Sequence, residues 1–295
     1  MPKVKNIIAA LPDAERIDVD ALRGDIVRGE LDLICVLGPT ASGKTRYAVN
    51  LARELAPCEI ISADSRQVYR GMDIGTGKDL DEYGDVRYHL IDIAEPGTQY
   101  NVYRFQQDFA AALADIRSRG AFPILCGGTG LYISAVTSGY DFISRKPLSE
   151  KRSPVDAGGT LSGGTLPASG SPPSSGVKVP PDKALPASLR TYFIGTLVSR
   201  EERNRRIDAR LDARLQEGMI DEIRGLLERG VPSQALISYG LEYKYVTLYL
   251  LGEIDYSTMR ERLAIAIHQF AKRQMTWFRG MERSGITIHW TEVNK

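Results

Sequence analysis

Leu33-Ile-Cys-Val-Leu37 runs directly into Gly38-Pro-Thr-Ala-Ser-Gly-Lys-Thr45, an apolar run followed by the pattern G-x-x-x-x-G-K-[ST]. The apolar run predicts a buried strand, and the periodicity from Lys44 to Leu55 predicts a helix after it. Between the two, glycines let backbone N–H groups curl inward at the positive end of the helix dipole, where they hold phosphate oxygens. We therefore predict a di- or triphosphate site formed by the whole loop: Gly38, Pro39, Thr40, Ala41, Ser42, Gly43, Lys44 and Thr45.

The last two residues of this phosphate-binding loop have chemical roles of their own. Lys44 would place a point charge at the terminal phosphate, and the Thr45 hydroxyl would be a ligand of Mg²⁺. The alternative is a glycine-rich turn that meets the pattern by chance, which the strand and helix on its flanks disfavour. Nucleotide-binding hydrolases and small-molecule kinases share the pattern, so the loop alone does not name the reaction.

The segments around this loop alternate between short apolar runs and helical patterns. Further strands are predicted at 59–62, 89–93, 122–126 and 189–195, and a helix at 105–119. Helical patterns follow at 201–229, 239–251 and 256–279, and an alternating run at 286–290 predicts a return to the sheet edge. The sequence thus predicts an α/β fold: a P-loop NTPase-like parallel sheet flanked by helices, with a helical C-terminal half.

Composition divides the chain into four parts. We predict an N-terminal extension over 1–30, the first part of the P-loop core over 31–142, a flexible linker over 143–188, and core completion with a basic helical region over 189–295. Of the 36 residues from 153 to 188, 20 are Ser, Pro or Gly and none is aromatic. Such a segment cannot bury enough apolar area to offset the entropy lost on ordering.

The overall composition excludes several classes of protein. Lys and Arg total 38 against 37 Asp and Glu, a net charge of +1, which excludes a histone-like or polyacidic protein but allows a local basic face. No apolar stretch approaches the roughly 18–20 residues that a membrane span needs, so no membrane partner is expected. The three cysteines form no CxxC pair, which argues against a disulfide framework or a zinc site and favours a cytoplasmic location.

A second polar stretch follows the predicted strand at 59–62: Ile60-Ile-Ser-Ala-Asp-Ser-Arg-Gln-Val-Tyr-Arg-Gly-Met-Asp-Ile-Gly-Thr-Gly-Lys78. Asp64 lies just past the carboxyl end of the strand, the edge where ligands bind in open α/β sheets. It could act as a base near the phosphates, or it could simply cap the next turn. Hydrogen-bonding and stacking groups stand beside it: Ser65, Arg66, Gln67 and Tyr69.

One further segment could face the same ligand, and a run of arginines marks a later helix. Gly127-Gly-Thr-Gly-Leu-Tyr132 follows a buried strand and opens a helix, although a plain tight turn is the alternative. Between Arg200 and Arg214 there are six arginines and four acids, and four of the arginines share one helix face: Arg203, Arg206, Arg210 and Arg214. A solvated charged face is the usual meaning of such a run.

The C-terminal helical region carries a basic and aromatic motif. In Lys272-Arg-Gln-Met-Thr-Trp-Phe-Arg279, bases alternate with aromatic rings, a composition typical of surfaces that grip a nucleic-acid backbone and stack its bases. The alternative is that Trp277 and Phe278 pack as core residues, and both interpretations can hold at once.

Five segments together resemble the tRNA dimethylallyltransferase (tRNA isopentenyltransferase) family. They are GPTASGKT, ISADSRQVYRGMDIGTGK, HLIDI, CGGTGLYI and QFAKRQMTWFR, in family order across 33–142 and 191–290, about 70% of the chain. The resemblance implies Mg²⁺-dependent transfer of a dimethylallyl group from dimethylallyl diphosphate to N6 of adenosine 37 in the tRNA anticodon loop. No nucleoside triphosphate would be consumed, and the loop, Lys44 and Mg²⁺ would stabilise the charge that develops on the leaving diphosphate.

The resemblance also assigns roles residue by residue. Asp64 matches the family's proposed base, Thr129 its substrate-contacting threonine, and Arg206, with Arg210 as second choice, the arginine of R-I-x-x-R that reaches the diphosphate. The catalytic set is then Asp64, Lys44, Thr45, Thr129 and Arg206. The residues expected to contact tRNA are Asp64, Ser65, Arg66, Gln67, Tyr69, Lys272, Arg273, Gln274 and Arg279.

The chain departs from the family pattern at 143–188. Most family members carry there a helical insertion with an arginine-containing helix that grips the anticodon stem-loop, whereas this chain has the Ser/Pro/Gly-rich segment. We therefore predict weakened binding to an isolated anticodon stem-loop. An inactive or altered paralogue that binds diphosphate or tRNA, and a small-molecule P-loop kinase, remain the alternatives, and a monomer is favoured.

Overall fold

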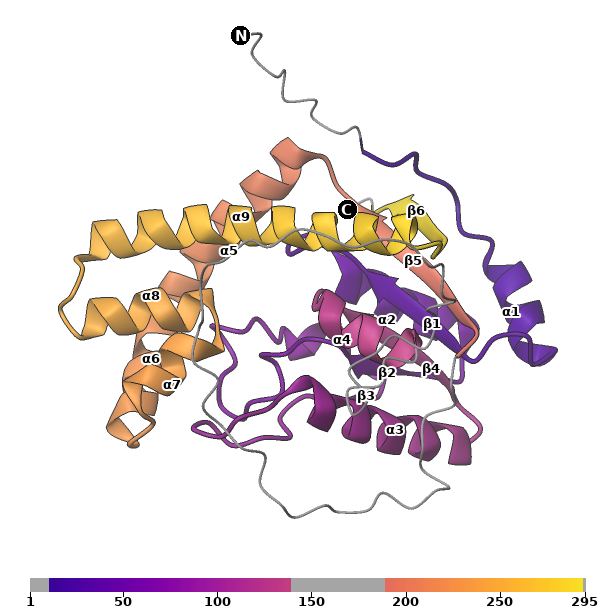
Figure 1. Ribbon diagram of the computed structural model, residues 1–295, viewed down its shortest axis with the longest axis horizontal. Coiled ribbons are helices and arrows are strands. Elements are labelled where there is room, and N and C mark those ends of the chain that lie inside the picture. The colour runs from indigo at the N-terminus through magenta and orange to yellow at the C-terminus, as the bar shows by residue number, and fades with distance from the viewer. Residues whose placement is uncertain (1–10, 139–188, 294–295) are drawn as a thin grey trace, which may run out of the picture.

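A parallel six-stranded sheet forms the centre of the molecule, as the computed structural model shows for residues 11–138 and 189–293 (Figure 1). The strand order is β3-β2-β4-β1-β5-β6, and every neighbouring pair is parallel. The strands are β1 (Leu33–Leu37), β2 (Cys58–Ser62), β3 (Tyr88–His89), β4 (Phe122–Gly127), β5 (Thr191–Leu197) and β6 (Ile288–Glu292). The predicted α/β fold with a parallel sheet is thus confirmed.

The first half of the chain contributes the helices α1 (Val19–Val27), α2 (Lys44–Leu55), α3 (Val102–Ser118) and α4 (Gly130–Thr137) and the short 3₁₀ helix η1 (Leu80–Glu82). The second half contributes α5 (Arg200–Gln216), α6 (Met219–Glu228), α7 (Ser233–Tyr239), α8 (Leu241–Leu250) and α9 (Tyr256–Arg283). In Figure 1, α6, α7 and α8 gather at one end of the long helix α9, away from the sheet. The helical C-terminal half is therefore confirmed.

The central strand β1 shows why the sheet is covered on both faces. All five of its residues are buried, as expected for a parallel strand whose two faces both meet apolar layers. Ile34 and Val36 pack into the core beneath α1 and α2, while Leu33, Cys35 and Leu37 face the core beneath α3, α4 and α9.

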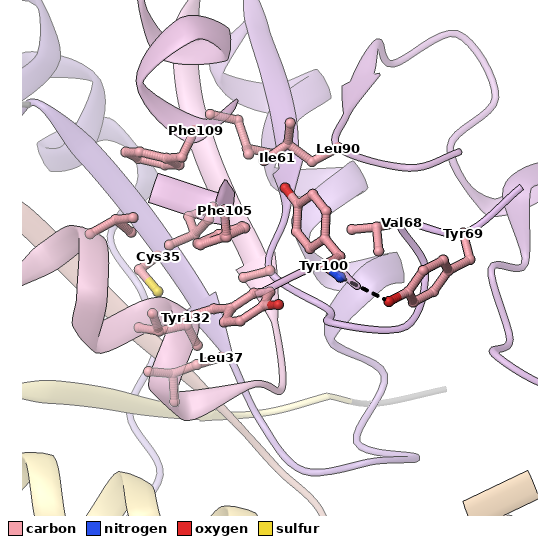
Figure 2. Packing of buried hydrophobic residues seen from close by; sticks show 14 of the residues in the cluster. Cys35, Leu37, Ile61, Val68, Tyr69, Leu90, Tyr100, Phe105, Phe109 and Tyr132 are labelled. Atoms are coloured by element: carbon pink, nitrogen blue, oxygen red, sulfur yellow. Dashed lines mark hydrogen bonds between the residues drawn. The ribbon is translucent and has the colours of Figure 1, made fainter. Parts of the chain in front are cut away.

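Aromatic side chains fill the core that lies beneath α3, α4 and α9 (Figure 2). The rings of Phe105 and Tyr132 stack with centroids 4.2 Å apart, which joins α3 to α4. Tyr69 is also buried here, and its hydroxyl accepts a hydrogen bond of 3.2 Å from the backbone N–H of Tyr100. The loop after β2 is therefore anchored in the core through its own aromatic residue.

Two elements differ in extent from the sequence-based prediction. The strand predicted at 89–93 is wrong beyond His89, because Leu90 and Asp92 adopt left-handed φ angles of 62° and 57°. This turn brings the Asp92 carboxylate to the buried Lys78 ammonium. The stretch predicted as helical over 201–229 is two helices, since Gly218 (φ 103°) breaks it before α6.

The final strand confirms the predicted return of 286–290 to the sheet edge. Strand β6 pairs with β5, so α5 to α9 form one long connection between two neighbouring parallel strands. The N-terminal segment is fastened to the same edge, because the N–H of Glu15 donates to the carbonyl of Trp290 at 2.7 Å. The predicted linker at 143–188 lies outside the described residues, and in the part of the chain that is described no helix has the length and apolar character of a membrane span.

Candidate active site

The phosphate-binding loop has the conformation that its glycines predict. Ala41 and Gly43 lie in the left-handed region, with φ of 64° and 81°, and Gly43 precedes α2 without any side-chain cap on the helix N–H groups. Ser42 is fully buried, and its hydroxyl pairs with that of Thr196 at 2.7 Å. Ser42 therefore fixes the loop to β5 through its side chain, and the N–H groups at the start of α2, which no side chain caps, can serve an anion.

The loop forms one wall of a cavity of about 100 Å³ at the carboxyl ends of the strands. The other walls come from the connection between β2 and β3 and from α5 and α8. The charged side chains that line it are Lys44, Asp64, Arg66, Asp79, Glu82, Arg210, Arg214 and Glu242, and Thr45 adds a hydroxyl. The structure thus brings the predicted phosphate loop and the predicted base into one cavity.

Asp64 lies at the entrance to the loop after β2, where the capping interpretation is observed and the role as a base stays a prediction. Its Oδ1 accepts a hydrogen bond of 2.9 Å from the N–H of Arg66, the local turn that a capping aspartate makes. The Arg66 guanidinium lies 3.6 Å from the same oxygen and donates to Glu242 at 2.8 Å. Glu242, which the sequence analysis did not single out, therefore holds the arginine beside Asp64.

Thr129 supports this loop from the next strand. Its hydroxyl accepts the N–H of Ser65 at 3.2 Å, and its own N–H donates to the carbonyl of Ala63 at 3.2 Å. Thr129 is not among the residues that line the cavity, whereas Gly127 is. In the structure its contacts are with the segment that carries Asp64.

The arginines of α5 separate into different environments. Arg210 and Arg214 line the cavity, with nitrogens 3.2 and 3.5 Å from Asp79 Oδ2. Arg206 donates from Nε to Glu202 at 2.7 Å and is not among the lining residues. The spacing of three and four residues placed Arg214 on one helix face with Arg206 and Arg210, a face interpreted as solvated, whereas Arg214 is 8% exposed. The family motif did not include Arg214.

The cavity contains positive and negative side chains whose pKa values are shifted toward the neutral form, because nearby opposite charges do not offset their burial. Burial lowers the pKa of Lys44, and Asp64 and Cys126 offset only part of this shift. Burial, reinforced by the neighbouring Arg210, lowers the pKa of Arg214 to about 10. Burial and the neighbouring Asp79 raise the pKa of Glu82. A bound anion would relieve the cations, and a bound cation would relieve Glu82.

The donor atoms present suit a hard divalent cation shared with phosphate oxygens. Thr45 and Glu82 offer only oxygen, the ligand that Mg²⁺ prefers, and Mg²⁺ commonly takes one or two protein ligands and completes its shell with phosphate and water. Within 11–138 and 189–293 no group of three or more His, Cys, Asp or Glu side chains could hold a metal by itself. The residues present therefore fit a Mg²⁺ ion that binds together with a phosphate ligand.

The residues predicted on the C-terminal helix also occupy distinct positions. Gln274 is buried, and its carboxamide accepts the N–H of Thr40 at 2.8 Å and donates to the carbonyl of Gly128 at 2.9 Å. It therefore braces the phosphate loop against the turn before α4. Lys272 and Arg273 are exposed, Phe278 is fully buried and Trp277 is 44% exposed. Phe278 therefore packs as a core residue, and a contact of Trp277 with nucleic acid stays a prediction.

Two other predicted contacts of tRNA lie inside the fold. Gln67 lines the cavity, and its carboxamide donates to the carbonyl of Gly77 at 3.0 Å. Tyr69 is 4% exposed, and its ring packs against that of Tyr239 at 4.2 Å between centroids. The structure places both residues where they shape the loop that carries Asp64.

Comparison with known proteins agrees with this geometry. Residues 67–161 and 165–281 match the family model of IPP transferases, and residues 31–91 match that of isopentenyl transferases. The tRNA dimethylallyltransferase 1 of Azobacteroides pseudotrichonymphae is 49% identical, and the alignment covers 90% of this chain and 94% of that protein. The tRNA dimethylallyltransferase 2 of Bacteroides fragilis is 46% identical over the same shares of the two chains.

A solved structure shows the same architecture. The full-length tRNA isopentenylpyrophosphate transferase from Bacillus halodurans superimposes with a TM-score of 0.68 at 30% identity and covers 88% of this chain and 89% of its own. The family model spans well over half of the chain, and the relatives align along nearly their whole length. On this basis the chain belongs to the IPP transferase family.

Proposed function

We propose that this protein transfers a dimethylallyl group from dimethylallyl diphosphate to N6 of adenosine 37 in the anticodon loop of tRNA. The observation that carries the proposal is the shape of the cavity. A phosphate loop and Asp64 share it, and through Thr40, Arg210, Arg214 and Glu242 it adjoins a small recess. The apolar lining of that recess is Ile207, Leu211 and Ile267. An allylic diphosphate has the same order of parts, a charged head and a short apolar tail.

The reaction exchanges one bond to the allylic carbon for another. The C–O bond breaks and its electron pair leaves with the diphosphate, while N6 of the adenine forms the new C–N bond and its proton passes to Asp64. The loop N–H groups and Lys44 bind the phosphates as their charge grows. Mg²⁺, when bound at Thr45, supplies further positive charge to the leaving group.

The tRNA partner is supported by the exposed part of α9. Lys272 and Arg273 offer cations for the phosphate backbone, and Trp277 offers a ring for stacking beside a shallow groove that also contains Ser134 and Gly280. An adenine inside a loop must be turned out of its stack to reach Asp64, and such contacts offset that cost. The weakened affinity for an isolated stem-loop stays a prediction, as do the monomeric state and the cytoplasmic location.

The named alternatives receive less support. A small-molecule P-loop kinase would share the loop, but relatives named tRNA dimethylallyltransferase align along nearly their whole length with this chain. An inactive paralogue that only binds its ligands is distinguished by turnover, which the following experiment measures.

The test is prenylation of tRNA with labelled dimethylallyl diphosphate and Mg²⁺. We expect product with the wild type and a loss of about 10²–10⁴-fold in kcat for Asp64→Asn, because the amide cannot take the proton. Asp20→Asn is the matched control, since Asp20 is an exposed carboxylate on α1 that is not among the residues lining the cavity. A wild type that modifies no tRNA overturns the proposed function, and full activity in Asp64→Asn overturns only the role of Asp64.

A further inference from the structure

Arg214 on α5 is a buried cation without a hydrogen-bond partner for one of its nitrogens. The residue is 8% exposed and lines the cavity, and its Nη2 finds no hydrogen-bond partner among the described residues. A buried guanidinium nitrogen of this kind costs free energy in the empty protein. The cost is recovered when a ligand with acceptor oxygens enters.

Gly77 lets a second guanidinium approach the same place. A Cβ on Gly77 would lie 1.7 Å from Arg214 Nη2 and 2.1 Å from Arg210 Nη2, so these two nitrogens are less than 4 Å apart. The carboxylate that faces both is Asp79, which is half-exposed and 3.2 to 3.5 Å away. Two like charges thus converge on one solvated carboxylate, and the repulsion contributes to the lowered pKa of Arg214.

We propose that Arg214 is a further diphosphate-binding residue, which acts with Arg210 as a guanidinium pair across the cavity from Lys44. In the free protein Asp79 partly neutralises the pair, and the incoming diphosphate takes its place. Arginine suits this role because its planar group donates two parallel hydrogen bonds to phosphate oxygens. When the allylic C–O bond breaks, the pair stabilises the negative charge that the departing electron pair brings to the diphosphate. The identity of the anion rests on the proposed function.

The first test is Arg214→Met, which keeps the length of the side chain and removes the charge. We expect the melting temperature of the free protein to stay equal or rise, because a poorly compensated buried charge is gone. Affinity for inorganic diphosphate with Mg²⁺, measured by calorimetry, should fall at least tenfold, with partial recovery in Arg214→Lys. The matched control is Arg205→Met on the same helix, where Arg205 is 60% exposed and paired with Glu202, and its diphosphate affinity should not change.

A structural role for Arg214 predicts a different pattern. In that case the free protein would melt earlier while diphosphate affinity stays at the wild-type value, and this result would overturn the proposal. An Arg214→Met protein that fails to fold would overturn it as well, because the removal of a mainly ligand-directed charge should leave the fold intact.

A second variant tests the pair from the opposite side. Asp79→Asn removes the half-exposed carboxylate that competes with the ligand, so diphosphate should bind severalfold more tightly than to the wild type. If Asp79→Asn binds diphosphate with unchanged or lower affinity, the diphosphate does not take the place of Asp79 beside the arginine pair. These binding measurements use no tRNA, so a wild type that binds diphosphate yet prenylates no tRNA contradicts the proposed function and leaves the assignment of Arg214 to be judged on its own data.

Discussion

Gly77 is the residue on which the geometry of the arginine pair depends. Its φ of 62° is costly for any L side chain, and its missing Cβ is what leaves room for Arg210 and Arg214. Gly71 has almost the same backbone angle, 63°, but nothing lies within 4 Å of the position of its Cβ. A comparison of substitutions at the two glycines therefore separates the effect of backbone strain from the effect of displacing the arginines.

We expect Gly71→Ala and Gly77→Ala to lose about 1–2 kcal/mol each from the left-handed backbone. Only Gly77→Ala should also bind diphosphate about tenfold more weakly, because the methyl group pushes the guanidiniums out of place. Urea unfolding measures the first effect and calorimetry with diphosphate the second. Equal diphosphate affinity in the two variants would show that the pair does not need the glycine.

At this scale the sequence could predict the residues whose chemistry is local. Residues 38–45 and Asp64 could be placed at the ligand-binding edge of the sheet because their positions follow from the strands and helix beside them. Gln274 was predicted to contact tRNA, but in the structure it braces Thr40 across 234 residues of chain. Glu242 pairs with Arg66 across 176 residues. Contacts of this kind leave no periodic trace in a sequence, so a single sequence could not reveal them.

At the scale of elements, a charged cluster fastens β2 to its neighbours. Glu59 in β2 accepts two hydrogen bonds from Arg119, at the end of α3, at 2.9 and 2.8 Å. His89 in β3 lies 2.6 Å from the same carboxylate. The Arg119 guanidinium, with a further contribution from His89, keeps the pKa of Glu59 below its ordinary value of 4.5.

This cluster predicts a pH dependence of stability. Because the pKa of Glu59 is lowered in the folded state, its contribution is fully present above about pH 4.5 and is lost as the pH falls through the folded-state pKa. Glu59→Gln should therefore lower the free energy of unfolding at pH 7 by about 1.5–3 kcal/mol, and the difference from wild type should shrink on acidification.

Urea unfolding of both proteins between pH 7 and pH 3.5 checks this, with the exposed Glu54→Gln as the control. A difference that stays constant over this range would show that the carboxylate charge is not the source of the stability.

The element boundaries show where local patterns stop being sufficient. The apolar runs of β1, β2 and β4 predicted those strands within a residue or two, since both faces of each strand meet a core. The strand predicted at 89–93 ends early because the chain turns at Asp92, whose carboxylate pairs with Lys78. The Lys78 ammonium also pairs with Asp73. The ion pairs of a fully buried lysine thus override the apolar pattern, and hydrophobic periodicity alone does not predict them.

At the scale of the whole molecule, the exposed end of α9 is the surface that we propose contacts tRNA. The Trp277 ring lies over Gly130, where an added Cβ would come within 2.3 Å of the indole. Trp277 is nevertheless 44% exposed to solvent. Tyr256, the first residue of the same helix, is 45% exposed and is not among the residues that line the cavity. The two residues form a matched pair for a binding experiment.

We expect Trp277→Ala to weaken tRNA binding by the roughly 1–3 kcal/mol typical of a lost base stack, with unchanged affinity for dimethylallyl diphosphate. Tyr256→Ala should bind tRNA as the wild type does. Fluorescence anisotropy with labelled tRNA, repeated at several salt concentrations, separates stacking from the salt-dependent backbone contacts. Equal losses in the two variants would contradict a specific stacking role.

The hydrogen bond between Thr40 and Gln274 has a consequence for how the protein is made. At about 5–20 residues per second, a ribosome needs roughly ten to fifty seconds to translate the 234 residues that separate these partners. During that time the nascent chain already contains the phosphate loop but not the side chain that braces it, nor the edge strand β6. A polypeptide released before Gln274 therefore has the loop without its brace, and the cavity beside the loop is completed only after this part of α9 has been translated.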